Sequence, residues 1–201
     1  MIHTWLADVS ALHEETAYRT YYEQVPEFRK EKANHLRRQE DKALSIGAWI
    51  LLQMMEKEFH LQGNYMFNLS HSGNCAICTV ATMENVSVGC DIERIGKART
   101  GMAERFFCPE EQEMIRTTED FYRFWVLKES FMKATRKGSN LALNAFGFAF
   151  TEENLPYLYK QPEEFPGKYY FKEYSMREFE YKIAVCADCD AFAEEMKMIK
   201  L

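Results

Sequence analysis

The stretch VSVGCDIERIG, residues 86–96, is informative about the fold, because an apolar run typical of a buried strand ends in two acidic side chains. In an extended chain the side chains alternate between two faces. Asp91 and Glu93 therefore point to one side, and Ile92 points to the other. Two neighbouring carboxylates repel each other unless a positive charge lies near both. That charge can belong to a lysine or arginine in an ion pair, or to a metal ion.

The composition is that of a globular protein. The 201 residues include 47% hydrophobic and 28% charged side chains, enough apolar surface for a packed core. No apolar run reaches the ~20 residues of a membrane span, and the first ten residues lack a signal-peptide pattern. We therefore expect a cytoplasmic protein with no membrane partner. The net charge of −6 argues against a nucleic-acid partner.

Two cysteine pairs, Cys75-x-x-Cys78 and Cys186-x-x-Cys189, have a spacing that is found in zinc sites. Both pairs lie in apolar runs typical of strands, where positions i and i+3 face opposite sides of a sheet. The pairs are also far apart in the chain, unlike those of a zinc ribbon. We therefore expect reduced thiols in the core and no zinc.

The predicted elements run from helices to strands, and then from helices to strands again. This order predicts an α+β fold of two similar halves, residues 1–97 and 98–201. In the first half, helices are expected from Ser10, from Pro26 and over 41–60, and strands are expected over residues 2–8, 65–69, 75–82 and 86–92. We expect the last three strands to form an antiparallel meander. In the second half, helices are expected from Pro109 and over 119–135, and strands are expected over 146–150, 168–174 and 181–187.

The segment from Arg29 to Lys42 is basic in an otherwise acidic chain, with six bases against three acids. Such a face suits a phosphate-bearing ligand or an acidic partner, although a solvated helix face gives the same pattern. The stretch FNLSHSGN, residues 67–74, adds His71 between two serines, which can donate to a phosphate oxygen. A histidine in a structural turn is the alternative interpretation. No G-x-S-x-G motif supports a serine hydrolase.

A third acid occurs in FYRFWVLKESFMKATRKG, residues 121–138. Trp125, Glu129 and Lys133 share one helix face at spacing i, i+4, i+8. A Glu–Lys pair of this kind is common on solvated helices, but here it lies in an aromatic-rich stretch. Together with the acids of residues 86–96, a carboxylate there favours a divalent cation. Oxygen ligands indicate Mg²⁺, with Mn²⁺ as the alternative, over zinc.

Four motifs in this order, FNLSHSG, VGCDIERIG, RFFCPEEQEMI and FWVLKESFMKA, resemble the Sfp-type (surfactin-type) 4′-phosphopantetheinyl transferases. The resemblance covers most of the chain. It implies two α+β halves related by a pseudo-twofold axis, with the ligand in the cleft between them. It also implies an enzyme that uses Mg²⁺ to transfer phosphopantetheine from coenzyme A to a serine of an apo acyl or peptidyl carrier protein, releasing 3′,5′-ADP. Because one chain holds both halves, we expect a monomer.

The resemblance also implies roles for single residues. Metal ligands would be Asp91, Glu93 and Glu129. Lys133 would neutralise pyrophosphate charge and, with Glu129, belong to the catalytic set. His71 and Ser70 would contact coenzyme A, with Lys128 nearby. Glu111 would be the general base for the carrier serine.

The chain departs from the family pattern at the nucleotide contacts. A Gly-Lys-Pro segment common before Ser-His-Ser is absent, since Gly63 leads directly into the strand. An arginine common in the basic segment aligns with Ala43 or Leu44. Arg37, Arg38 and Lys42 are expected to substitute for these groups.

Two other functions remain open from the sequence. One is a non-catalytic relative that binds a carrier protein or a nucleotide, and the other is a metal-dependent phosphodiester hydrolase. For a transferase, we expect Arg99, Met102 and Phe106 to form part of the carrier-docking surface, since carrier proteins tend to be acidic.

Overall fold

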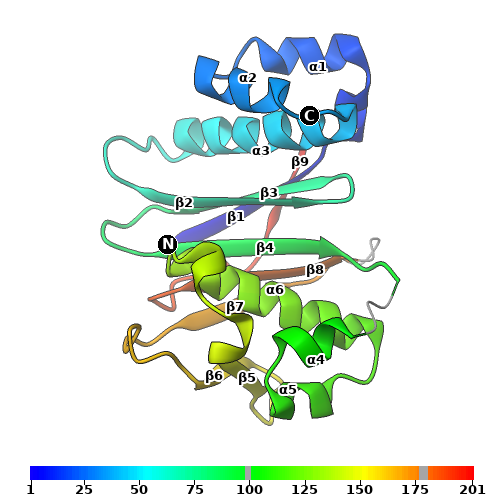
Figure 1. Cartoon of the computed structure of the whole chain (residues 1–201). Coiled ribbons are helices and arrows are strands. Elements are labelled where there is room, and N and C mark those ends of the chain that lie inside the picture. The colour runs from blue at the N-terminus through cyan, green and yellow to red at the C-terminus, as the bar shows by residue number, and fades with distance from the viewer. Residues whose placement is uncertain (98–100, 177–180) are drawn as a thin grey trace. The chain divides into compact units, whose positions relative to one another are not determined.

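The computed structural model describes residues 1–97, 101–176 and 181–201. The chain divides into two compact units. Unit 1 holds Met1–Asn85 together with Ala191–Leu201, and unit 2 holds Val86–Asp190. Each unit contains helices and strands, so the expected α+β class is confirmed (Figure 1). The division differs from halves at 1–97 and 98–201, because the strand with Asp91 belongs to unit 2 and the C-terminal segment to unit 1.

Unit 1 is a four-stranded sheet covered on one face by helices. The strands, in sheet order, are β2 (Met66–Ser72), β3 (Cys75–Ala81), β1 (Ile2–Asp8) and β9 (Lys197–Lys200). The helices are α1 (Glu15–Tyr22), α2 (Glu27–Asn34) and α3 (Gln39–Glu58). Helix α3 lies between the sheet and the other two helices, so it is buried on two sides (Figure 1). Strand β9 pairs parallel to β1, whereas β3 pairs antiparallel to both of its neighbours.

Two local details of unit 1 differ from the sequence expectation. The single helix expected from Ser10 is a 3-10 turn, Ser10–His13, followed by α1, because Glu14 adopts an extended conformation between them. Strand β9 was not predicted. Its sequence, KMIK, has a single half-buried apolar residue, Ile199, so it carries no alternating signal.

Unit 2 is built around one long helix, α6 (Thr118–Ala134), which lies on a three-stranded sheet. The strands, in sheet order, are β4 (Val88–Arg94), β8 (Tyr181–Ala187) and β7 (Tyr170–Tyr174). The hairpin of β5 (Gly147–Phe150) and β6 (Pro156–Lys160), with helices α4 (Met102–Phe106) and α5 (Pro109–Met114), completes the unit. The 3-10 turns are Gly138–Asn140 and Leu143–Ala145. Thr117 caps α6 by accepting a hydrogen bond from the Asp120 amide.

The expected meander of three strands is wrong in its third member. Strands β2 and β3 pair as predicted, but β4 pairs antiparallel with β8, and Asp91 lies opposite Ala184. The short connector Met-Glu-Asn favoured a hairpin with β3. Instead, β4 is buried from Val88 to Ile92, and its apolar side chains pack against both α6 and β8.

Each unit has its own core. Unit 1 buries mainly aliphatic side chains of α3 and the sheet, whereas unit 2 buries a cluster rich in phenylalanine around α6. Cys75, Cys78 and Cys186 are buried in these cores and Cys189 is half-buried, in agreement with the expectation of core thiols. None of the helices in the described ranges is both long and apolar enough to cross a bilayer.

The placement of β9 makes a first prediction. Ile199 packs against the core of unit 1, while the neighbouring Met198 is 53% exposed. We expect Ile199→Ala to lower the free energy of unfolding by about 1–2 kcal/mol, since part of a core contact is lost. Met198→Ala should change it by less than about 0.5 kcal/mol. Urea denaturation measures both changes in the free energy of unfolding. If Ile199→Ala had as small an effect as Met198→Ala, the contact of Ile199 would add nothing to the stability of unit 1.

Candidate active site

Strand β4 and helix α6 touch through their backbones, and this contact positions the candidate site. A Cβ atom added at Gly89 would lie 2.2 Å from the Ser130 carbonyl oxygen and 2.3 Å from the Ala134 nitrogen. No other residue type fits that gap. The close approach brings the acidic strand and the helix face of Glu129 and Lys133 together.

Asp91 and Lys133 form an ion pair across this contact. The Lys133 Nζ lies 2.6 Å from Asp91 Oδ1 and also donates to the Cys90 carbonyl at 3.1 Å. Asp91 is buried and Lys133 is partly exposed. Burial lowers the pKa of Lys133, but the charge of Asp91 and the hydrogen bond to it outweigh burial, and the pKa is raised. The first positive charge near the acids is therefore a lysine.

Glu129 is the second acid of the candidate site. It is half-buried, and its pKa is raised by burial and by the negative charge of Asp91, with Lys133 acting in the opposite direction. A carboxylate held beside a second negative charge marks a place where a cation is stabilised. Mg²⁺ commonly takes one or two carboxylates and completes its shell with water and phosphate oxygens. Asp91 and Glu129 fit this requirement.

Glu93, the third expected ligand, is half-buried two residues further along β4, and its strand partner is Lys182. Ile92, between the acids, is fully buried, as the alternation predicts. Within the described ranges, no three acidic, histidine or cysteine side chains gather closely enough to form a metal centre. The arrangement is thus two acids and a lysine, with Glu93 at its margin.

Glu111 and Lys128 occupy a different environment from the one their expected roles require. Both side chains are 0% exposed, and they form an ion pair of 2.9 Å. Burial lowers the pKa of Lys128, and the charge of Glu111 acts against this shift. A general base and a phosphate ligand must be reachable by their substrates, so this environment argues against both expected roles.

Unit 1 contains a cavity of about 390 Å³ beside β2, which we name the His71 cavity. It is lined by Arg29, Lys32, Leu36, Asp41, Ser45, Ala48, residues 67–69 and His71. Arg29 and Lys32 reach it from one face of α2 at spacing i, i+3, and Leu36 follows the end of that helix. Phe67 is 39% exposed at its edge. The cavity combines cationic groups with an aromatic ring.

Arg29 is the most unusual group of the His71 cavity. This residue is buried, with a relative exposure of 7%, and its guanidinium lies 4.5 Å from the Trp49 ring centroid. One nitrogen donates a long bond of 3.5 Å to Ser45 Oγ, and Nε has no hydrogen-bond partner among the described residues. Burial lowers the pKa of Arg29. A buried guanidinium with spare donors is suited to an anion.

The expected nucleotide ligands fall partly inside and partly outside this cavity. His71 lines it, and Ser70, the preceding residue of β2, is buried. Arg37 and Arg38 are exposed and Lys42 is half-buried, and none of the three lines the cavity. Sequence reasoning counted Arg29 and Lys32 in the basic segment but did not select them. Their i, i+3 spacing, which places both on one face of a helix, is the sequence pattern that could have identified them.

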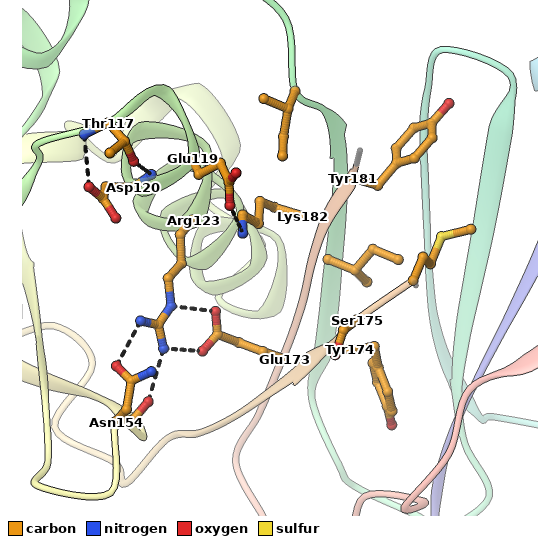
Figure 2. Close-up of a pocket in the computed structure, with 13 residues that line it drawn as sticks. Thr117, Glu119, Asp120, Arg123, Asn154, Glu173, Tyr174, Ser175, Tyr181 and Lys182 are labelled. Atoms are coloured by element: carbon orange, nitrogen blue, oxygen red, sulfur yellow. Dashed lines mark hydrogen bonds and ion pairs between the residues drawn. The ribbon is translucent and has the colours of Figure 1, made fainter. Parts of the chain in front are cut away.

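Unit 2 has a second cavity of about 750 Å³, at the start of α6 and beside β7 and β8 (Figure 2). Arg123 binds Glu173 through two nitrogens at 2.8 and 2.6 Å, and it also binds Asn154 (Figure 2). Lys182 pairs with Glu119 at 3.1 Å. These polar side chains bind one another, so the cavity wall holds α6 to β7.

Of the expected docking residues, Met102 and Phe106 are half-buried on α4, and Arg99 lies outside the described residues.

The contact at Gly89 makes a second prediction. We expect Gly89→Ala to lower the free energy of unfolding by about 3 kcal/mol, because the new methyl group would meet backbone atoms that cannot rotate away. Gly167→Ala is the matched control, since its Cβ would have only an ordinary contact with Tyr169, and it should change stability by less than about 1 kcal/mol. Chemical denaturation followed by circular dichroism compares them. Similar stabilities would mean that α6 moves away from β4 at little cost.

Comparison with known proteins gives the family. The model of the 4′-phosphopantetheinyl transferase superfamily matches residues 87–186, the part that holds β4, α6 and β8. A 4′-phosphopantetheinyl transferase of Bacillus subtilis is 32% identical over 141 residues, covering 66% of this chain and 59% of that protein. The ffp transferase of Bacillus subtilis is 33% identical over 152 residues, covering 68% and 61%.

The Sfp transferase of Bacillus subtilis strain 168 is 32% identical over 139 residues, covering 66% of this chain and 59% of that protein. The chain thus spans 59–61% of the length of these three relatives. The matched region contains both strand and helix of the Asp91–Lys133 pair. This chain belongs to the 4′-phosphopantetheinyl transferase superfamily.

Proposed function

We propose that this protein transfers the 4′-phosphopantetheine group of coenzyme A to a serine of an apo acyl or peptidyl carrier protein, releases 3′,5′-ADP and depends on Mg²⁺. The observation that carries the proposal is the grouping of Asp91, Glu129 and Lys133 in a protein of this superfamily. We further propose that it acts as a monomer in the cytoplasm.

In the proposed reaction, the serine oxygen forms a bond to the β-phosphorus of coenzyme A, and the bond from that phosphorus to the 3′,5′-ADP oxygen breaks. Negative charge develops on both sides of the phosphorus. Lys133 supplies a fixed positive charge, since it stays protonated beside Asp91. When bound by Asp91 and Glu129, Mg²⁺ would supply charge stabilisation for the pyrophosphate oxygens.

The serine proton also needs an acceptor. Glu129 is half-buried rather than enclosed, and its pKa is raised by burial and by Asp91. Unlike a fully enclosed carboxylate, Glu129 can be reached by a substrate. We propose Glu129 for this role in preference to Glu111, which is fully enclosed.

For the nucleotide part of coenzyme A we propose the His71 cavity. Arg29, Lys32 and His71 offer donors to a phosphate, and the exposed ring of Phe67 offers a stacking surface to a base. Arg29 thereby supplies an anion-binding group in a chain that lacks the Gly-Lys-Pro lysine. Arg37, Arg38 and Lys42, placed outside the cavity lining, are left for weaker, longer-range attraction.

The third prediction concerns transfer itself. With coenzyme A, Mg²⁺ and a panel of apo carrier proteins, intact-mass spectrometry should show addition of the phosphopantetheine mass. Lys133→Ala and Asp91→Ala should lower kcat by at least about 10²-fold, because charge stabilisation is lost. Lys57→Ala, an exposed lysine of α3, is the control and should leave the rate unchanged. Circular dichroism verifies that each variant is folded.

Calorimetry with a carrier and with Mg²⁺–coenzyme A, together with analysis of released nucleotide, identifies the alternative functions. Carrier binding without binding of Mg²⁺–coenzyme A would identify a non-catalytic docking relative, and the missing Gly-Lys-Pro segment is the feature that favours it. Release of 3′,5′-ADP in the absence of any carrier would identify a hydrolase. Full activity of Lys133→Ala would remove the role proposed for that lysine.

The fourth prediction concerns the His71 cavity. Arg29→Met should raise the Kd of coenzyme A by about 10–100-fold, since hydrogen bonds to a charged group are lost. Arg19→Met, an exposed arginine of α1, is the matched control and should change the Kd by less than about twofold. Isothermal titration calorimetry measures both. An unchanged Kd in Arg29→Met would place the nucleotide elsewhere.

A further inference from the structure

We infer that Glu111 and Lys128 are a positioning pair: together they fix helix α6, and neither accepts the serine proton nor binds coenzyme A. The inference rests on the proposed function, because it concerns how Glu129 and Lys133 are held for that reaction. It reverses the roles that the motif around Glu111 suggests.

Enclosure is the first reason. Both side chains are 0% exposed, and the Lys128 ammonium lies 4.5 Å from the Phe146 ring centroid and 5.7 Å from that of Phe107. Aromatic rings therefore stand where a phosphate or a carrier serine would have to approach. A charged pair is costly to desolvate, and a structure that keeps one must satisfy its hydrogen bonds internally.

The hydrogen bonds of the lysine are complete. Lys128 Nζ has three N–H donors, and it has three partners: Glu111 Oε2 at 2.9 Å, the Leu143 carbonyl at 2.8 Å and the Phe146 carbonyl at 2.7 Å. No donor remains for a phosphate oxygen. Binding coenzyme A would require breaking one of these buried bonds.

The carboxylate is similarly engaged. Glu111 Oε1 accepts from the Phe148 amide at 2.8 Å, and Oε2 accepts from the Cys108 amide at 2.8 Å as well as from Lys128. Both oxygens therefore hold backbone groups of other segments.

These partners tie α6 to four other places in unit 2. Glu111 belongs to α5, Cys108 precedes that helix, Phe148 lies in β5, and Leu143 opens a 3-10 turn. Lys128 is the neighbour of Glu129 on α6, so anchoring it fixes the rotation of the helix. The close contact at Gly89 fixes the distance between α6 and β4. Together they set where Glu129 and Lys133 point.

The test compares Glu111→Gln, Lys128→Met and the double variant Glu111→Gln/Lys128→Met. Each single variant leaves a buried partner without its counter-charge, so Tm should fall by about 10 °C. The double variant removes both charges and should recover most of that loss. The matched control is the exposed pair Lys137–Glu164, where Lys137→Met/Glu164→Gln should shift Tm by less than about 3 °C.

Kinetics on the folded variants separates positioning from catalysis. In the double variant, kcat should stay within about tenfold of the parent. The pH profile of kcat/KM should keep both its acidic and its basic limb. The single variants should lose kcat while the KM for coenzyme A changes little, since orientation and not binding is affected. A double variant that folds like the parent yet loses about 10²-fold or more, with one limb of the profile missing, would make Glu111 the general base and overturn the inference.

A measurement on the unmodified protein covers the case in which the double variant does not fold. Lysine acetylation followed by mass spectrometry should leave Lys128 unlabelled, with or without coenzyme A, and should label exposed Lys57 in both. Labelling of Lys128 that coenzyme A suppresses would overturn the inference. If no carrier is modified by the parent protein, the proposed function fails, whereas Tm recovery and lysine labelling still decide whether the pair is enclosed and mutually satisfied.

Discussion

Direct backbone contact between β4 and α6 is the constraint on which unit 2 depends. Glycine at position 89 removes the one atom that would hold the two elements apart. Only at this short distance does Lys133 reach Asp91, and only then does Glu129 experience the negative charge of the strand. The chemistry proposed for the protein is therefore built on a packing detail that has no chemical function of its own.

Much of the fold follows from the sequence because its signals are local. Strand β1, helix α6 and strand β8 have strong apolar patterns, and their predicted ranges match the structure within two residues. Strand pairing is different, since it depends on which surface is available after the whole chain has folded. The pairing of β4 with β8 instead of β3 could not be read from a three-residue connector. Likewise, β9 has too few apolar residues to be detected.

The candidate site divides in the same way. The acid-x-acid pattern and the i, i+4 pair of α6 were visible in the sequence, and the structure brings Asp91, Glu129 and Lys133 together. A motif does not record whether its charges face solvent or the core. Glu111 and Lys128 look as suitable for catalysis as Glu129 does, but both are enclosed because α5, which carries Glu111, packs against α6 and β5. Arg29 shows the opposite case, since an ordinary member of a basic helix becomes an enclosed guanidinium whose Nε has no hydrogen-bond partner among the described residues.

Strand β9 has a consequence for the order in which the protein is made. Unit 1 requires residues from both ends of the sequence, whereas unit 2 is one continuous segment inserted between them. During synthesis on the ribosome, all of unit 2 is available before the last strand of unit 1 exists. A sheet that closes through such distant residues is slow to form, because the chain entropy of a long loop must be overcome. The inserted segment can therefore complete its fold first, and the sheet of unit 1 gains its edge strand only after β9 has been synthesised.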